Sequence, residues 1–302
     1  MAQPATGLAP DSPPDVALRH IVAECHRDLL KYRAVALQSR RPIGIHQTRV
    51  ALRRLRAAFG LFKSAVDGPI VRGLSAEAKW LAGECGPARD LYVFLNETVQ
   101  DVPLVVKRVG NRLATAHLER ARTALSGARF ENFERQLEAF MKLPPPDRRG
   151  QLDDFAREVL DQRHDKVMRR GRKLASLDSE RLHRLRIAIK KLRYAASFLR
   201  PAFASPLAKP YIEATTRLQN ALGALNDRSV ADHVLADLAT AARPTEDVRL
   251  ALKELAEQTK GGNKRRRRRL QEAWQQFEAV PCFWRPRPAA SSPGVGMRRE
   301  SE

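Results

Sequence analysis

Apolar residues recur along most of the chain at intervals of three and four residues, which is the spacing of one face of an α-helix. Ala, Leu, Arg, Glu and Gln are abundant, and the alternation of apolar and polar residues typical of strands is nearly absent. Prolines such as Pro42, Pro69 and Pro103 fall between the periodic segments, where helices should begin or end. The pattern predicts an all-α protein.

A second regularity has a much longer period. The segments Ile45–Arg56 and Leu182–Arg193 share a pattern of histidine, arginine, paired basic residues and a final Leu-Arg, at an offset of 137 residues. The same offset, without an insertion, aligns two further pairs, Gly86 with Gly223 and Arg112 with Arg249. We therefore predict two homologous halves of four to five helices each, 16–142 and 143–280, joined across three prolines that interrupt any helix.

The two ends of the chain differ from the rest. Residues 1–15 are rich in proline and poor in apolar residues, and residues 281–302 are rich in Pro, Ser and Gly, so we expect both to be disordered. The apolar runs are far shorter than the roughly 20 residues of a membrane-spanning helix, and no secretory signal is visible. Three cysteines without pairing or metal spacing are typical of a reducing compartment, which predicts a cytoplasmic protein.

The net charge of the chain narrows the classes of molecule that it is expected to bind. Fifty-five Lys and Arg against 34 Asp and Glu give a formal net charge of +21. An excess of this size favours binding to a polyanion, which leaves nucleic acid, anionic lipid and phosphate polymers open.

The repeated motif concentrates that charge on two helices. Placed on a helix, four residues of the first copy form one stripe opposite the apolar face and Arg54 borders it; the second copy repeats the arrangement, with Lys191 in the place of Arg54. Like charges at these spacings repel by a few tenths of a kcal/mol per pair, and a stripe about 15 Å long suits an extended anion. The predicted contacts are His46, Arg49, Arg53, Arg54, Arg56, His183, Arg186, Lys190, Lys191 and Arg193.

In these motifs the chain resembles the CHAD family, the conserved histidine α-helical domain, over about residues 16–280. The segments His46–Arg56 and Leu182–Tyr194 carry the resemblance, together with Trp80 through Asp90 and Leu218–Asp227. The resemblance implies two four-helix bundles related by a pseudo-twofold axis, with a basic central pore that binds inorganic polyphosphate. It assigns ligand contact to the ten residues above. Many relatives carry an N-terminal triphosphate-tunnel (CYTH) domain, for which this chain leaves no room, so we expect a stand-alone form.

From this we expect a binding protein rather than an enzyme, without cofactor or metal. We expect it in the cytoplasm on polyphosphate granules, with granule-associated proteins as further partners and nucleic acid only as a competing, non-specific polyanion. Two alternatives stay open: a nucleic-acid-binding protein, and a phosphohydrolase that uses a histidine of the stripe. The second would need a metal or a nucleophile that the sequence does not reveal.

Other polar features have weaker signals. Asp90 and Asp227 repeat at the 137-residue offset and are placed to cap a helix or hold an arginine. The run Lys264–Arg269 is either the start of a helix that extends the anion-binding surface, a nuclear-localisation or nucleic-acid patch, or a solvated face. Five histidines share no spacing and receive no role: His20, His26, His117, His164 and His233.

Overall fold

A computed structural model describes residues 9–39, 42–66, 68–144, 150–243, 245–260 and 263–285. The prediction of an all-α protein is confirmed, since the described chain forms eleven α-helices, one π-helical turn and two 3-10 turns, and no strand. Within these ranges no helix is long and apolar enough to cross a membrane. The elements are α1 (Pro14–Gln38), α2 (Pro42–Leu61), α3 (Pro69–Glu84), α4 (Gly86–Val93), η1 (Phe94–Thr98), α5 (Leu104–Ser126), α6 (Ala128–Lys142), α7 (Leu152–Gly171), η2 (Leu174–Ser176), α8 (Ser179–Leu199), η3 (Arg200–Ala202), α9 (Ala208–Ala241), α10 (Glu246–Lys260) and α11 (Asn263–Ala279).

The helix boundaries follow local chemistry. Pro14, Pro42 and Pro69 are the first residues of α1, α2 and α3, where proline costs no hydrogen bond and its fixed φ suits a helix. The carboxylate of Asp178 caps α8 by accepting a hydrogen bond of 2.7 Å from the backbone N–H of Arg181. The prolines thus act as the sequence predicts, at the starts of helices.

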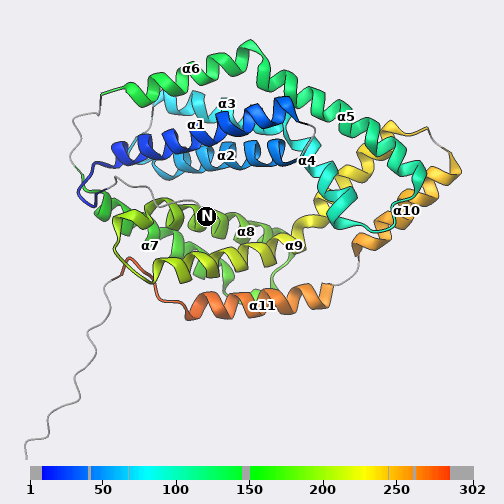
Figure 1. Ribbon diagram of the computed structural model, residues 1–302. Coiled ribbons are helices and arrows are strands. Elements are labelled where there is room, and N and C mark those ends of the chain that lie inside the picture. The colour runs from blue at the N-terminus through cyan, green and yellow to red at the C-terminus, as the bar shows by residue number, and fades with distance from the viewer. Residues whose placement is uncertain are drawn as a thin grey trace, which may run out of the picture.

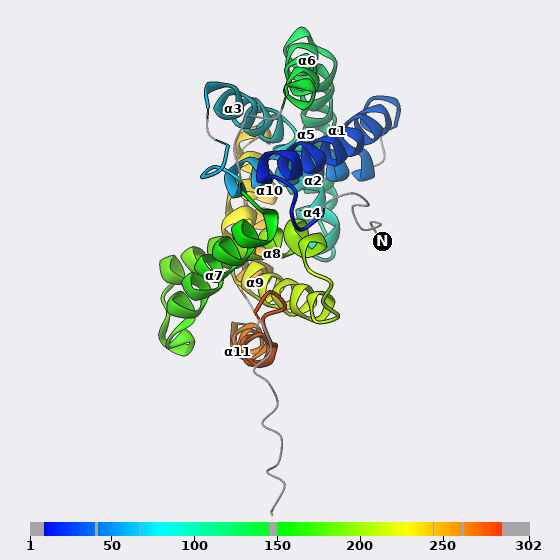
Figure 2. The ribbon, with the colours of Figure 1, turned by 90° about the vertical axis from the view of Figure 1, so that its left-hand side faces the viewer.

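The helices form two packed groups (Figure 1). Helices α1, α2, α3 and α6 make the first group and α7, α8, α9 and α11 the second, and α2 contacts α8 between them. One buried apolar cluster runs through both groups, from Ala17 to Trp284. A smaller cluster joins α5 and α10 to the end of α9, with Val106 and Leu255 among its members. Seen from the side, α2 and α8 lie in the middle of the molecule, between the outer helices (Figure 2).

Helix bounds also follow the 137-residue offset. Helices α2 and α8 begin 137 residues apart, at Pro42 and Ser179, and α6 and α11 end 137 residues apart, at Lys142 and Ala279. Helices α3 and α4 correspond to the single long helix α9, which continues through Gly223. The pseudo-twofold axis and the central pore stay predictions.

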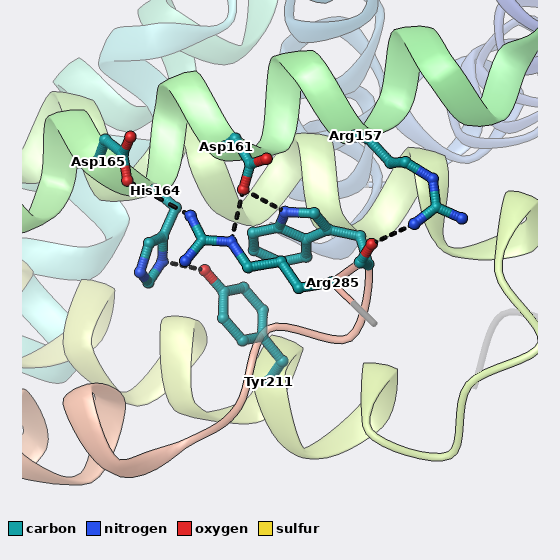
Figure 3. A network of polar contacts seen from close by, with 7 residues as sticks. Arg157, Asp161, His164, Asp165, Tyr211 and Arg285 are labelled. Atoms are coloured by element: carbon teal, nitrogen blue, oxygen red, sulfur yellow. Dashed lines mark hydrogen bonds and ion pairs between the residues drawn. The ribbon is translucent and has the colours of Figure 1, made fainter. Parts of the chain in front are cut away.

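The segment after α11 corrects one prediction. The sequence predicts disorder from residue 281, yet 281–285 fold back onto α7 and α9, and Trp284 is only 1 % exposed. Its indole Nε1 donates to Asp161 at 2.8 Å, Arg285 Nε donates to the same carboxylate oxygen at 2.7 Å, and Arg157 donates to the Trp284 carbonyl at 2.6 Å (Figure 3). The aromatic ring overrides a proline-rich composition because it fills the core.

At the N-terminus the last two residues of the predicted tail, 1–15, belong to helix α1. Helix α1 begins at Pro14, and Asp15 is 4 % exposed. Residues 1–8 and 286–302, on which most of the predicted disorder falls, lie outside the described residues, as does most of the proline junction at 145–149.

Candidate anion-binding site

The two motif helices meet through their basic stripes. Buried leucines on α2 and α8 hold the apolar faces in the core, so the opposite faces turn toward the space between the helices. Arg53 Nε on α2 donates a hydrogen bond of 2.9 Å to the hydroxyl of Tyr194 on α8. This contact joins residues 141 positions apart and links the two motif helices directly.

Three pockets adjoin one another from the contact of α2 with α8 to the contact of α8 with α7, because each shares lining residues with the next. Their volumes are about 340, 230 and 380 Å³. None of the described residues that line them is acidic. The basic lining residues are Arg53, Arg186 and Lys190 in the first pocket, Arg53, Arg56, Arg163, Lys190 and Lys191 in the second, and Arg163, Lys166, Arg170, Arg184 and Lys191 in the third.

Lys190 lies at the centre of this charge. Burial lowers the pKa of its ammonium to about 8, and the positive charges of Arg53, Arg186, Arg56 and Arg193 act in the same direction. Lysine is normally protonated far above neutral pH, so this shift reports crowded cations with no counter-charge. A bound polyanion would supply that counter-charge.

A third helix contributes cations that the sequence reasoning missed. Arg163 on α7 donates to the backbone carbonyl of Lys191 at 2.8 Å, and burial lowers its pKa to about 10. Burial also lowers the pKa of Lys191, with Arg163, Lys166 and Arg170 adding to the effect. The spacing of these three α7 residues, at i, i+3 and i+7, puts them on one helix face and could have indicated the site.

Arg49 is held by the acid that the sequence singles out. Its Nη2 lies 3.4 Å from Asp90 Oδ1, so Asp90 holds an arginine, which is one of the two roles that the sequence predicts for it. Its Nη1 lies where a Cβ on Gly86 would come within 2.8 Å, so glycine at this position leaves room for the guanidinium. The side chain of Asp227, the partner at the repeat offset, lies outside the described residues.

The surroundings of His46 favour its neutral form. Burial lowers its pKa, and the charges of Arg89, Arg53 and Arg49 lower it further against the opposing effect of Glu97. A neutral imidazole can donate one hydrogen bond to a phosphate oxygen. A polyanion beside it would raise the pKa again and add a charge.

Five of the ten predicted contacts line the three pockets, namely Arg53, Arg56, Arg186, Lys190 and Lys191. Arg54 is one of the five that do not. Its guanidinium pairs with two carboxylates of α1, Asp28 at 3.0 Å and Glu24 at 3.6 Å, and it lines none of the three pockets. The residue borders the stripe by its helical angle, and the acids on α1 draw it to the other side. Its contact with a ligand stays a prediction, which would require the guanidinium to leave these carboxylates.

Two more predicted residues, Arg193 and His183, line none of the three pockets. Arg193 Nε donates to Gln219 at 2.8 Å, and its guanidinium lies 4.6 Å from the ring centre of Tyr194. His183 is exposed on α8.

The basic run Lys264–Arg269 lies elsewhere. It forms the first turns of α11, as one of the three interpretations predicts, and α11 packs on α9. Arg268 pairs with Glu272 at 3.5 Å on the surface. None of its cations lines the pockets between α2 and α8.

Comparison with known proteins agrees with this arrangement. The family model of the CHAD domain matches residues 20–236, which is most of the chain, so the protein belongs to the CHAD domain family. Its structure is similar to that of the CHAD domain from the plant Ricinus communis, with a TM-score of 0.79, 27 % sequence identity, and coverage of 93 % of this chain and 97 % of that one.

A second solved structure shares the fold alone. PptA from Streptomyces chartreusis is 18 % identical, with a TM-score of 0.64 over 87 % of this chain and 100 % of its own. None of the curated proteins compared with the chain matches it.

Proposed function

We propose that this protein binds inorganic polyphosphate in the basic pockets between α2, α7 and α8, without hydrolysing it. The main support is the position of Lys190. Its pKa is lowered to about 8, and it lies in pockets that are lined by arginines and by none of the described acids. A site of this kind is unfavourable when empty and is stabilised by a dense anion. The chain belongs to the CHAD family. Its resemblance to that family implies binding of polyphosphate, which supports the same ligand.

The adjoining pockets favour an extended ligand over a single phosphate. The first and second share Arg53 and Lys190, and the second and third share Arg163 and Lys191, so cations follow one another from α2 to α7. Arginines can grip phosphate oxygens with two hydrogen bonds, whereas lysines act as point charges. A linear polyphosphate presents charges at the spacing of its phosphates and carries no bases that a narrow groove must exclude.

The absence of catalysis is part of the proposal. Two rows of cations hold an anion but supply neither a nucleophile nor a placed metal for phosphoanhydride cleavage. We also propose that binding attaches the protein to polyphosphate granules in the cytoplasm, where granule-associated proteins would be its neighbours.

One experiment separates the three functions. The purified protein is titrated with long-chain polyphosphate, duplex DNA and single-stranded RNA at about 0.15 M salt, the physiological ionic strength, and released phosphate is measured with and without Mg²⁺. We expect the tightest binding to polyphosphate and no phosphate release. Equal or tighter binding of DNA or RNA would indicate a nucleic-acid-binding protein. Phosphate release by the wild-type protein that is lost in the His46→Ala variant would establish a phosphohydrolase.

A further inference from the structure

A histidine and two glutamates from two helices converge in the first group of helices. His26 lies on α1, and Glu134 and Glu138 lie one turn apart on α6, which packs against α1 (Figure 1). One ligand atom from each of the three side chains lies within 4.8 Å of the other two. None of the three lines the pockets between α2 and α8.

The state of His26 sets this cluster apart from an ordinary group of surface acids. The residue is only 8 % exposed, and its Nε2 is buried without a hydrogen-bond partner among the described residues. The nearest carboxylate oxygen, Glu134 Oε1, is 3.9 Å away, which is too far for a hydrogen bond. Buried ring nitrogens are nearly always paired, so this one points to a group that completes it.

We propose that His26, Glu134 and Glu138 bind a divalent transition-metal ion, with Zn²⁺ as the best match. Imidazole nitrogen is a ligand for Zn²⁺, Co²⁺ and Ni²⁺, whereas Mg²⁺ and Ca²⁺ prefer oxygen alone. Zinc bonds to nitrogen and oxygen are about 2.0–2.2 Å long. The three ligand atoms, which lie within 4.8 Å of one another, must therefore come closer together on binding. The glutamate side chains are 25 % and 46 % exposed and have the freedom to do so.

Local charge favours a cation here, although the whole protein is basic. Glu134 and Glu138 are like charges at i and i+4, which repel each other and which a dication would neutralise. The competing partner, Lys142, lies 3.9 Å from Glu138 and is 79 % exposed, so this ion pair is weak. By contrast, His46 is surrounded by arginines, which exclude a metal ion.

A bound ion would tie α6 to α1. Helix α6 buries Phe130 and Phe133 in the core of the first group, and the metal would add a link between α6 and α1. Because the unfolded chain does not hold the three ligands together, metal binding stabilises the folded state.

The test uses the full chain after treatment with a chelator. Titration with Co²⁺, followed by its visible absorption and then displaced by Zn²⁺, should show one equivalent bound, and Zn²⁺ should raise the Tm. The double variant Glu134→Gln/Glu138→Gln removes two ligands from the surface without touching the core. We expect it to weaken Co²⁺ binding at least about tenfold, as the loss of even supporting residues does, and His26→Gln to do the same.

Two control variants separate this site from non-specific binding. Glu131→Gln removes another exposed acid of the same helix, and His46→Gln removes a histidine of the anion site. Both should bind Co²⁺ like the wild type. Absence of a Co²⁺ signal, or binding that the double glutamate variant leaves unchanged, would overturn the proposal whether or not His26→Gln folds. Neither result bears on polyphosphate binding.

Discussion

Lys190 gives the anion site a pH dependence that its arginines cannot provide. Its pKa is lowered to about 8 by burial and by the surrounding arginines, which themselves stay charged. A bound polyanion stabilises the protonated lysine and raises its pKa, so binding takes up a proton. We expect polyphosphate affinity to fall about tenfold between pH 7 and pH 9, as the free lysine loses its proton.

The conservative variant Lys190→Arg is the control for this prediction. Arginine keeps its charge over the whole range, so its binding curves, measured by the same titration, should change little with pH. Identical pH profiles for the wild type and the variant would contradict the role of Lys190.

The stability of the ligand-free protein has the opposite pH dependence. The pKa of Lys190 is lowered from 10.5 on folding, so the unfolded chain binds the proton more tightly. The free energy of unfolding should therefore rise as pH increases from about 8.

Single residues also show where sequence reasoning ends. Arg53 and Lys190 were predictable because the motif repeats and the helical angle places both on a stripe. The pairing of Arg54 with Asp28 and Glu24 was not predictable, since these acids lie on another helix and only the packing of α1 on α2 brings them together. Arg163 was missed because α7 has no counterpart of the motif, although it lines two of the pockets.

At the scale of elements, periodicity and prolines predicted the helices, and the repeat identified the two that meet. Composition misled at the C-terminus. Pro281 and the Ser- and Gly-rich residues beyond indicate disorder, but residues 281–285 include two buried aromatic rings, Phe283 and Trp284. The average composition of a stretch of residues does not reveal the free energy gained by burying a large aromatic ring.

Trp284 therefore tests whether this segment belongs to the fold. Trp284→Ala should lower the free energy of unfolding by about 3–5 kcal/mol, because it empties a buried site and leaves Asp161 without its indole donor. Arg285→Ala removes only half-exposed ion pairs and should cost less than about 1 kcal/mol. Urea unfolding followed by circular dichroism measures both. Equal, small effects would mean that the segment is not part of the core.

At the scale of the molecule, the fold brings part of the excess positive charge, +21 in all, together in one place. The two groups of helices meet at α2 and α8, and α7 adds its cations at one end of the seam. The sequence predicted this meeting through the repeat and the family resemblance. It could not predict the third helix, because the position of α7 depends on packing between residues far apart in the chain.

The most direct test of polyphosphate binding is the salt dependence of affinity in a triple variant. Arg53→Ala/Arg56→Ala/Lys190→Ala removes three cations that line the central pockets. Each lost phosphate contact lowers the slope of log affinity against log salt by about 0.7–0.9, a value taken from nucleic acids. The matched control, Arg120→Ala/Arg135→Ala/Arg249→Ala, removes the same charge from surfaces that line none of these pockets. We predict weaker binding and a slope lower by about 2–3 in the pocket variant, with near wild-type values in the control. Equal affinity and slope in two folded variants would contradict the account.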